Sequence, residues 1–162
     1  MNDAALTLKY AHILLVDDDH DVRDSMCRAL VQAGHNVMEA ESGEAAVALI
    51  CRSIPFDMLV TDVRMPNQRD GAALASCWRE TAPGKPLLFV SGQTDVHLDV
   101  GLLGPHEAVL QKPFRRTALL DAVQLLLAQR FTAATPASAG MGQDDAALPK
   151  YDLRPRRRAR AC

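Results

Sequence analysis

Acidic, hydroxyl and amine side chains stand in this sequence at places where short apolar runs end. Neighbouring carboxylates repel one another, and a hard divalent cation such as Mg²⁺ relieves that repulsion because it prefers oxygen ligands. An amine and a hydroxyl beside the metal suit a phosphoryl group, and aspartate is a known covalent nucleophile. The pattern therefore indicates phosphoryl transfer to an aspartate. The residues are Asp17, Asp18 and Asp19 after "ILLV", Asp62 after "MLVT", Ser91 after "LLFV" and Lys112 after "AVLQ".

Five such runs alternate with helical patterns between residues 13 and 130. The central runs are continuously apolar, which is typical of parallel strands buried on both faces. The sequence therefore predicts an α/β fold: a doubly wound, five-stranded parallel sheet with helices on both faces. Parallel strands end at one edge, where such sheets bind ligands, so these side chains are expected at a single crevice. The expected strands are 13–16, 36–40, 57–62, 86–92 and 108–111.

The helical segments between these strands differ in strength. Asp19 and Ser42 stand where N-caps belong, and a third helix is expected after Gly71. Residues 94–103 have an apolar face at helical spacing but contain a glycine, which costs a helix about 1 kcal/mol relative to alanine. Residues 116–130 carry the strongest helical pattern in the chain.

The apolar arc of this last helix is broader than one buried face needs. Leu119, Leu120, Val123, Leu126 and Leu127 form the face expected to cover the sheet. Further apolar residues extend the arc, so part of it is expected to be exposed as a partner surface. A homodimer through the face formed by residues 94–130 is one such expectation. The residues that extend the arc are Ala118, Ala122 and Leu125.

Composition places the chain among proteins with an aliphatic core. Of its 162 residues, 48% are hydrophobic and only 4% are aromatic. No apolar run reaches the roughly 18 residues that span a membrane, and the N-terminus lacks a signal-peptide layout. Four scattered cysteines indicate thiols in a reducing compartment. We therefore expect a cytoplasmic protein without a membrane partner.

Charge divides the chain into two regions. Residues 132–162 hold six basic and three acidic side chains, which gives this segment a net charge of +3. The whole chain has a net charge of −2, so the remaining residues carry a net charge of −5. We therefore expect an N-terminal extension at 1–9, one folded domain at 10–131 and a flexible basic tail at 132–162. The tail segment "RPRRRAR" suits nucleic acid or another anionic surface, or it is a disordered solubilising end.

The motifs "ILLVDDD", "LVTDVRMP", "VSGQ" and "QKPF" occur in this order. Together they resemble the receiver domain of two-component response regulators, over roughly residues 10–130. The resemblance implies a flavodoxin-like sheet with strand order 2-1-3-4-5. It implies a single-domain signalling switch that accepts a phosphoryl group from a histidine kinase or a histidine phosphotransfer protein. Such a domain catalyses only its own phosphorylation and dephosphorylation, so we do not expect an enzyme in the ordinary sense.

The resemblance also implies a metal site. Asp62 would be the phosphoacceptor and, with Asp18, would bind Mg²⁺ or Mn²⁺ directly. Asp17 would hold the ion mostly through water, and the backbone carbonyl of Arg64 would be a further ligand.

The same resemblance implies roles around the phosphoryl group. Ser91 would donate a hydrogen bond to it, and Lys112 would pair with its charge. Arg64 and Gln93 stand at positions that tune the lifetime of the acyl phosphate. Ser91 and Val109 stand at the positions that switch between the two signalling states.

The chain departs from the family pattern in two places. Four residues, 67–70, separate Pro66 from Gly71 where three are usual, and Val109 stands where an aromatic residue is usual. Valine is small and stiff at χ1, so the usual aromatic switch is not expected. The Lys112–Pro113 bond is expected to be cis, as in the family, because X-Pro bonds permit this at modest cost.

Two alternatives come from other classes of protein. In a haloacid-dehalogenase-like phosphatase, Asp17 would be the nucleophile and Asp19 the acid. That class expects a further acidic pair late in the chain, where this sequence has "QKPF", and a cap domain would not fit in the length. Taken as a helix cap, Asp19 has no such role. The other alternative is a nucleic-acid-binding protein that acts through the basic tail.

Overall fold

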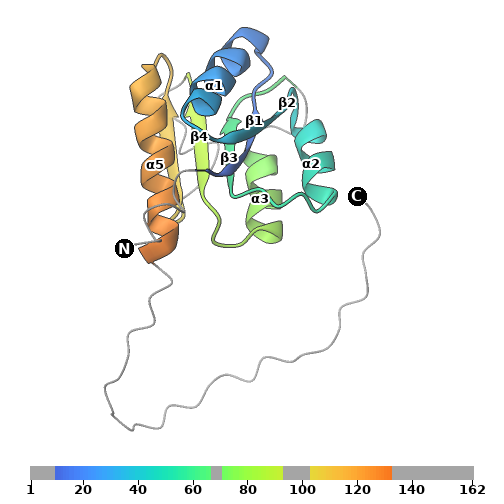
Figure 1. Cartoon of the computed structure of the whole chain (residues 1–162). Coiled ribbons are helices and arrows are strands. Elements are labelled where there is room, and N and C mark those ends of the chain that lie inside the picture. The colour runs from blue at the N-terminus through green and yellow to red at the C-terminus, as the bar shows by residue number, and fades with distance from the viewer. Residues whose placement is uncertain (1–9, 67–70, 93–102, 133–162) are drawn as a thin grey trace, which may run out of the picture.

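One parallel sheet of five strands lies at the centre of the protein, in the order β2-β1-β3-β4-β5 (Figure 1). The structure, a computed structural model, describes residues 10–66, 71–92 and 103–132. The elements are β1 (His12–Val16), α1 (His20–Gln32), β2 (Asn36–Ala40), α2 (Gly43–Cys51), β3 (Met58–Asp62), α3 (Gly71–Thr81), β4 (Leu87–Ser91), β5 (Glu107–Gln111) and α5 (Arg116–Thr132).

The predicted fold class and strand order are confirmed. Every strand pairs in parallel with its neighbours, and each expected strand is found within one residue of its predicted bounds. The helix expected at 94–103 lies outside the described residues, except for Leu103, which is not helical.

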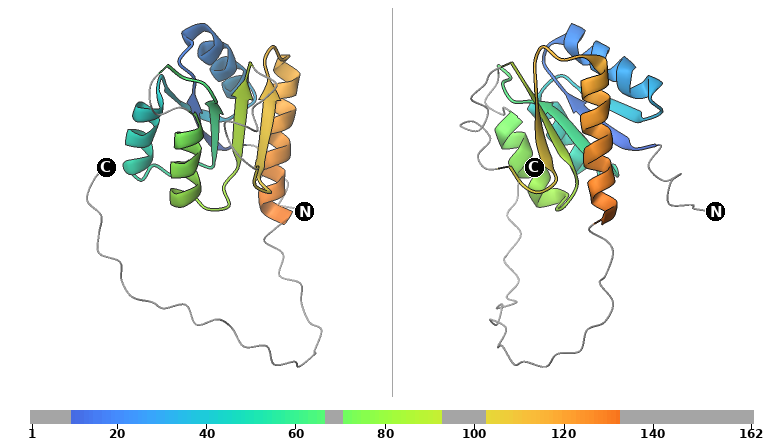
Figure 2. Two further views of the ribbon diagram at one scale, coloured as in Figure 1. Left: turned by 180° about the vertical axis from the view of Figure 1, so that it is seen from behind. Right: turned by 90° about the vertical axis from the view of Figure 1, so that its left-hand side faces the viewer.

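Two apolar cores lie on the two faces of the sheet, because successive side chains of a strand point to opposite faces. Helices α1 and α5 cover one face, and α2 and α3 cover the other (Figure 2). The core under α1 and α5 includes Ile13, Leu15, Leu30, Val60, Leu88 and Val123. The core under α2 and α3 includes Leu14, Val16, Leu59, Leu74, Trp78 and Phe89. Burying each such side chain contributes roughly 1.5–3 kcal/mol.

Two of the predicted helix starts have the expected side-chain caps. Asp19 Oδ1 accepts hydrogen bonds from the backbone N–H groups of Asp21, at 3.0 Å, and Val22, at 3.2 Å. Ser42 Oγ accepts one from the N–H of Ala45 at 3.1 Å. Each cap satisfies N–H groups that the first turn leaves unpaired, which contributes about 1 kcal/mol.

The broad apolar arc predicted for the last helix divides as expected. Leu119, Val123, Leu126 and Leu127 of α5 are buried against the sheet. Leu125, on the outer side of the same helix, is 61% exposed.

None of the helices within 10–66, 71–92 and 103–132 is long and apolar enough to cross a membrane. Cys27, Cys51 and Cys77 are thiols that form no disulfide. Cys162 lies outside the part of the chain that the structure describes.

Gly71 brings the start of α3 against the end of β3. Its N–H donates to the carbonyl of Val63 at 3.0 Å. A Cβ at this position would lie 2.1 Å from the backbone oxygen of Asp62 and 2.8 Å from the Cα of Val63. Both atoms belong to the backbone, which cannot turn aside like a flexible side chain. Only glycine permits this approach beside Asp62.

We expect Gly71→Ala to lower the free energy of unfolding by roughly 1–3 kcal/mol, the cost of overpacking a rigid contact. Gly92→Ala is the matched control, because a Cβ there meets nothing within 4 Å. Chemical denaturation of both variants gives the comparison. Equal stabilities would show that the contact at Gly71 relaxes without cost.

His35 links stability to pH. Its Nδ1 accepts a hydrogen bond from the N–H of Ala11 at 3.3 Å, which requires the neutral ring. Burial lowers the pKa of His35 from its ordinary value. His35 therefore binds a proton more readily in the unfolded chain than in the folded one, so protonation favours unfolding. The stability that neutral His35 contributes is fully present above the unfolded pKa. It is lost as pH falls from the unfolded pKa, about 6.5, through the folded pKa.

We expect the wild-type protein to lose stability between about pH 7.5 and pH 5.5 more steeply than His35→Gln, which has no proton to bind there. Urea unfolding of both proteins across this range measures the difference. Parallel curves would show that His35 does not contribute to the pH dependence.

Candidate functional site

The side chains singled out in the sequence stand at the carboxyl edge of the sheet. Asp17 and Asp18 follow the last residue of β1, and Asp62 is the last residue of β3. Ser91 is the last residue of β4, and Lys112 directly follows β5. The parallel pairing of these strands brings all five positions to one end of the molecule, because their carboxyl ends point the same way.

Lys112 joins two of the carboxylates. Its Nζ lies 2.9 Å from Asp17 Oδ2 and 2.8 Å from Asp62 Oδ2. The Asp17 side chain is 0% exposed, that of Asp62 13% and that of Lys112 22%. One ammonium group therefore neutralises part of the charge of two carboxylates that water hardly reaches.

Asp17 and Lys112 differ in what controls their pKa. Burial raises the pKa of Asp17, and the hydrogen bond from Lys112 opposes this without cancelling it. Burial also disfavours the charged form of Lys112, but its hydrogen bonds to Asp62 and Asp17 outweigh burial and raise its pKa. Lys112 is therefore held as a cation, and the ionised form of Asp17 depends on a positive charge nearby.

Backbone groups hold the remaining oxygens of the two carboxylates. Asp17 Oδ1 accepts from the N–H of Asp19 at 2.9 Å, and Asp62 Oδ1 accepts from the N–H of Arg64 at 3.0 Å. Both side chains are thus fixed from two directions. Asp19 turns its own carboxylate to the start of α1, where it caps the helix.

Asp17, Asp18 and Asp62 have the donor chemistry of a magnesium site. Each offers a carboxylate oxygen, and these oxygens lie within 4.8 Å of one another. Hard divalent cations favour such all-oxygen sets, and Mg²⁺ usually takes one or two carboxylates together with waters and phosphate oxygens. Three carboxylates and one ammonium leave two formal negative charges, which a divalent cation balances. The residues present therefore fit Mg²⁺ or Mn²⁺.

The positions beside this acidic cluster have different surroundings. Ser91 is buried, and its carbonyl accepts from the N–H of Lys112 at 2.7 Å. The Lys112–Pro113 bond is cis, as predicted. Val109 is opposite Phe89 in the sheet and packs against the core under α2 and α3. Gln93 lies outside the described residues.

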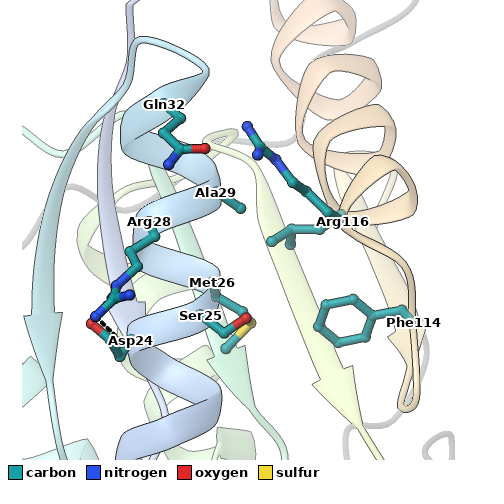
Figure 3. Close-up of a pocket in the computed structure, with 9 residues that line it drawn as sticks. Asp24, Ser25, Met26, Arg28, Ala29, Gln32, Phe114 and Arg116 are labelled. Carbon is teal, nitrogen blue, oxygen red and sulfur yellow. Dashed lines mark hydrogen bonds and ion pairs between the residues drawn. The ribbon is translucent and has the colours of Figure 1, made fainter.

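A groove between α1 and α5 adds a feature that the sequence did not reveal. Met26 and Phe114 line a cavity of about 340 Å³ between these helices (Figure 3). The same two residues line a neighbouring cavity of about 390 Å³ whose wall includes Lys112 and Pro113. The groove therefore leads from the acidic cluster along α1.

Fold and site together define a class of protein. A doubly wound sheet with three aspartates and one lysine at its carboxyl edge is the arrangement of a phosphoacceptor signalling domain. The family model of the response regulator receiver domain matches residues 13–124. The chain belongs to this family and is a two-component phosphoacceptor switch.

Individual relatives support the same assignment. The chain is 34% identical over 116 residues to the response regulator receiver protein CpdR of Brucella abortus (strain 2308), across 71% of this chain and 95% of CpdR. It is 34% identical over 114 residues to the response regulator protein FleR of Pseudomonas aeruginosa, across 70% of this chain. That match spans only 24% of FleR. The chain is also 37% identical to the response regulator MprA of Mycobacterium leprae, and this second match spans only 50% of MprA.

Solved structures show the same fold. A response regulator receiver protein from Sinorhizobium medicae WSM419 is 31% identical, with a TM-score of 0.69 over 76% of this chain and 98% of that one. The receiver domain of the hybrid histidine kinase CckA is 30% identical, with a TM-score of 0.60 over 72% of this chain and 98% of that one.

Neither alternative function gains support from the described residues. The phosphatase hypothesis needs Asp17 as an accessible nucleophile and Asp19 as an acid. Asp17 is fully buried beneath Lys112, and Asp19 caps α1. The nucleic-acid hypothesis concerns the tail at 132–162, of which the structure describes only Thr132, so it stays a prediction.

Proposed function

We propose that this chain accepts a phosphoryl group on Asp62 in a two-component phosphorelay. The observation that carries the proposal is the contact of Lys112 Nζ with both Asp17 and Asp62 at the sheet edge. Asp17, Asp18, Asp62 and the backbone carbonyl of Arg64 hold Mg²⁺. When bound, the metal supplies positive charge to the phosphoryl oxygens.

The transfer involves one bond formed and one bond broken. A carboxylate oxygen of Asp62 attacks phosphorus, and the bond from phosphorus to the donor's histidine nitrogen breaks, leaving its electron pair on the imidazole. The Lys112 ammonium leaves Asp62 Oδ2 and donates instead to a phosphoryl oxygen, while it keeps its hydrogen bond to Asp17. The Ser91 hydroxyl donates to another phosphoryl oxygen, and Arg64 and Gln93 set how fast water removes the group.

The donor is a histidine kinase or a histidine phosphotransfer protein, which docks over the groove between α1 and α5. Phe114 supplies apolar surface there, and Arg116 supplies positive charge (Figure 3). The groove reaches Lys112, so a helix laid along it places its histidine near Asp62. The exposed Leu125 on the outer side of α5 is available for a homodimer contact.

Labelling with acetyl phosphate tests the proposal without a protein donor. The full chain is incubated with the reagent and Mg²⁺, and intact-mass analysis counts the phosphoryl groups gained. We expect one, and none when a chelator removes the metal. Labelling that survives the chelator would contradict a metal-assisted reaction.

The receiver unit itself spans residues 10–131 in this proposal, with a cytoplasmic location. We expect a chain that ends at Phe131 to keep the melting temperature and labelling of the full protein, because α5 already covers its face of the sheet. Thermal unfolding measures the first property and intact mass the second. A fall of more than a few degrees would show that the tail stabilises the domain.

The tail has a separate test. If residues 132–162 contact nucleic acid, the full chain binds nonspecific DNA with an affinity that falls as salt rises, and the chain ending at Phe131 does not. Fluorescence anisotropy at two salt concentrations separates these outcomes.

A further inference from the structure

Arg23 is a largely buried cation beside Asp17, and the proposed transfer does not use it. It comes from the start of α1, and its side chain is 12% exposed. Its Nη1 donates to the backbone carbonyl of Asp17 at 2.6 Å, and its Nε lies 3.5 Å from Oε1 of Glu39 on β2. Its Nη2 lies 3.4 Å from Nδ1 of His20. The guanidinium therefore joins the segment that follows β1 to the edge strand β2.

The contact with Asp17 fixes one of the two peptide groups that flank Asp18. The carbonyl of Asp17 and the N–H of Asp18 belong to one planar peptide unit, so a hydrogen bond to the carbonyl orients the whole unit. The next unit contains the N–H of Asp19, which donates to Asp17 Oδ1 at 2.9 Å. Hydrogen bonds therefore hold the backbone on both sides of Asp18.

The Asp18 side chain depends on this backbone for its direction. Hydrogen bonds hold the carboxylates of Asp17 and Asp62, whereas no other described residue forms a hydrogen bond or ion pair with the carboxylate of Asp18. Asp18 is also exposed, so packing does not confine it. The peptide units beside it are what direct this carboxylate toward the acidic cluster.

Glu39 sets the direction of the guanidinium. It lies two positions after Val37, which packs in the core under α1 and α5, so both side chains point to the face that α1 covers. The planar fork of arginine lets Nε meet Glu39 while Nη1 reaches the Asp17 carbonyl. A lysine ammonium is a single nitrogen on a flexible stem and has no such fork.

We propose that Arg23 is a positioning residue for the magnesium site: it holds the peptide between Asp17 and Asp18 so that the Asp18 carboxylate faces the cation. The inference rests on the metal site of the proposed function. Groups that orient metal ligands in this way typically contribute about 10–100-fold in metal affinity. Charge alone predicts the opposite sign, because removing a cation from beside carboxylates strengthens their attraction for a metal ion.

The test measures divalent-cation binding by the unphosphorylated full chain. Mn²⁺ is titrated while electron paramagnetic resonance follows its free concentration, and Mg²⁺ or Ca²⁺ then displaces it. We expect Arg23→Met to weaken Mg²⁺ binding by about tenfold or more, and Ca²⁺ binding by less. Mg²⁺ demands near-ideal octahedral geometry whereas Ca²⁺ accepts irregular ligand sets, so misdirected ligands lower the preference for Mg²⁺. A loss of fold stability alone would not change this preference.

Two further variants separate position from charge. Arg28→Met removes a positive charge from an exposed site on the same helix and should bind Mg²⁺ as the wild type does. Arg23→Lys keeps the charge but lacks the fork, so we expect it to weaken Mg²⁺ binding several-fold. It also keeps a long apolar stem, so it decides the question if Arg23→Met does not fold.

Equal or tighter Mg²⁺ binding by Arg23→Met overturns the role of Arg23, and so does an equal loss of Mg²⁺ and Ca²⁺ affinity. Unchanged affinity in Arg23→Lys overturns it as well. Failure of the metal site has a different signature, in which Asp18→Asn binds Mn²⁺ as tightly as the wild type or the wild type binds none. Either of these results overturns both the magnesium site and the role of Arg23.

Discussion

Replacing Asp62 with asparagine abolishes labelling by acetyl phosphate while the domain stays folded. The amide is not a nucleophile, so no acyl phosphate forms. Asparagine has nearly the same shape, and Lys112 keeps its contact with Asp17 in the variant. We therefore expect the mass gain of one phosphoryl group in the wild-type protein and none in Asp62→Asn, with similar melting temperatures.

Asp121→Asn is the matched control. Asp121 is exposed on α5, and the same chemical change there leaves the site at the carboxyl edge untouched. This control should label like the wild-type protein. A phosphoryl group on Asp62→Asn, located by peptide mapping on Asp17 or Asp18, would contradict the proposed acceptor and reopen the phosphatase hypothesis.

Replacing Lys112 with methionine destabilises the domain when no divalent cation is present. The substitution leaves the buried carboxylate of Asp17 facing Asp62 without the ammonium that separates their charges. Losing one partner of a fully buried pair costs about 3–5 kcal/mol, and the partial exposure of Lys112 reduces this to roughly 2–4 kcal/mol. We expect the melting temperature in a chelator to fall by roughly 10 °C.

Magnesium should restore much of this loss. A cation that binds only the folded state stabilises it by about 2.7 kcal/mol at about a hundred times its dissociation constant. Without competition from Lys112, the carboxylates bind the ion more tightly, so Mg²⁺ raises the melting temperature of Lys112→Met more than that of the wild type. Thermal unfolding across a Mg²⁺ titration measures both effects.

Arg28→Met provides the comparison for this second prediction. Arg28 pairs with Asp24 on the surface of α1, where the two side chains are largely open to water. Such pairs contribute about 0–1 kcal/mol, so this variant should unfold close to the wild type and respond equally to Mg²⁺. If Lys112→Met behaves like Arg28→Met, the bridge does not stabilise the fold.

The sequence by itself determined the architecture and the positions of the reactive groups. Continuous apolar runs predicted buried parallel strands, and four of the five predicted strands ended in or were followed by a polar residue of the site, at the edge where such strands meet. The N-caps at Asp19 and Ser42 were also readable, because a cap depends on residues only two or three positions away. Local patterns of this kind need no knowledge of the rest of the chain.

The tertiary structure decided which groups touch. Lys112 lies 95 positions from Asp17 and 50 from Asp62, and its bridge between them exists only once β1, β3 and β5 are aligned in one sheet. The approach of Gly71 to the backbone of Asp62 arises in the same way. The burial of the Trp78 indole N–H, which has no hydrogen-bond partner among the described residues, likewise depends on all the segments packed around it. Contacts between distant segments follow from packing, and packing is a property of the whole fold.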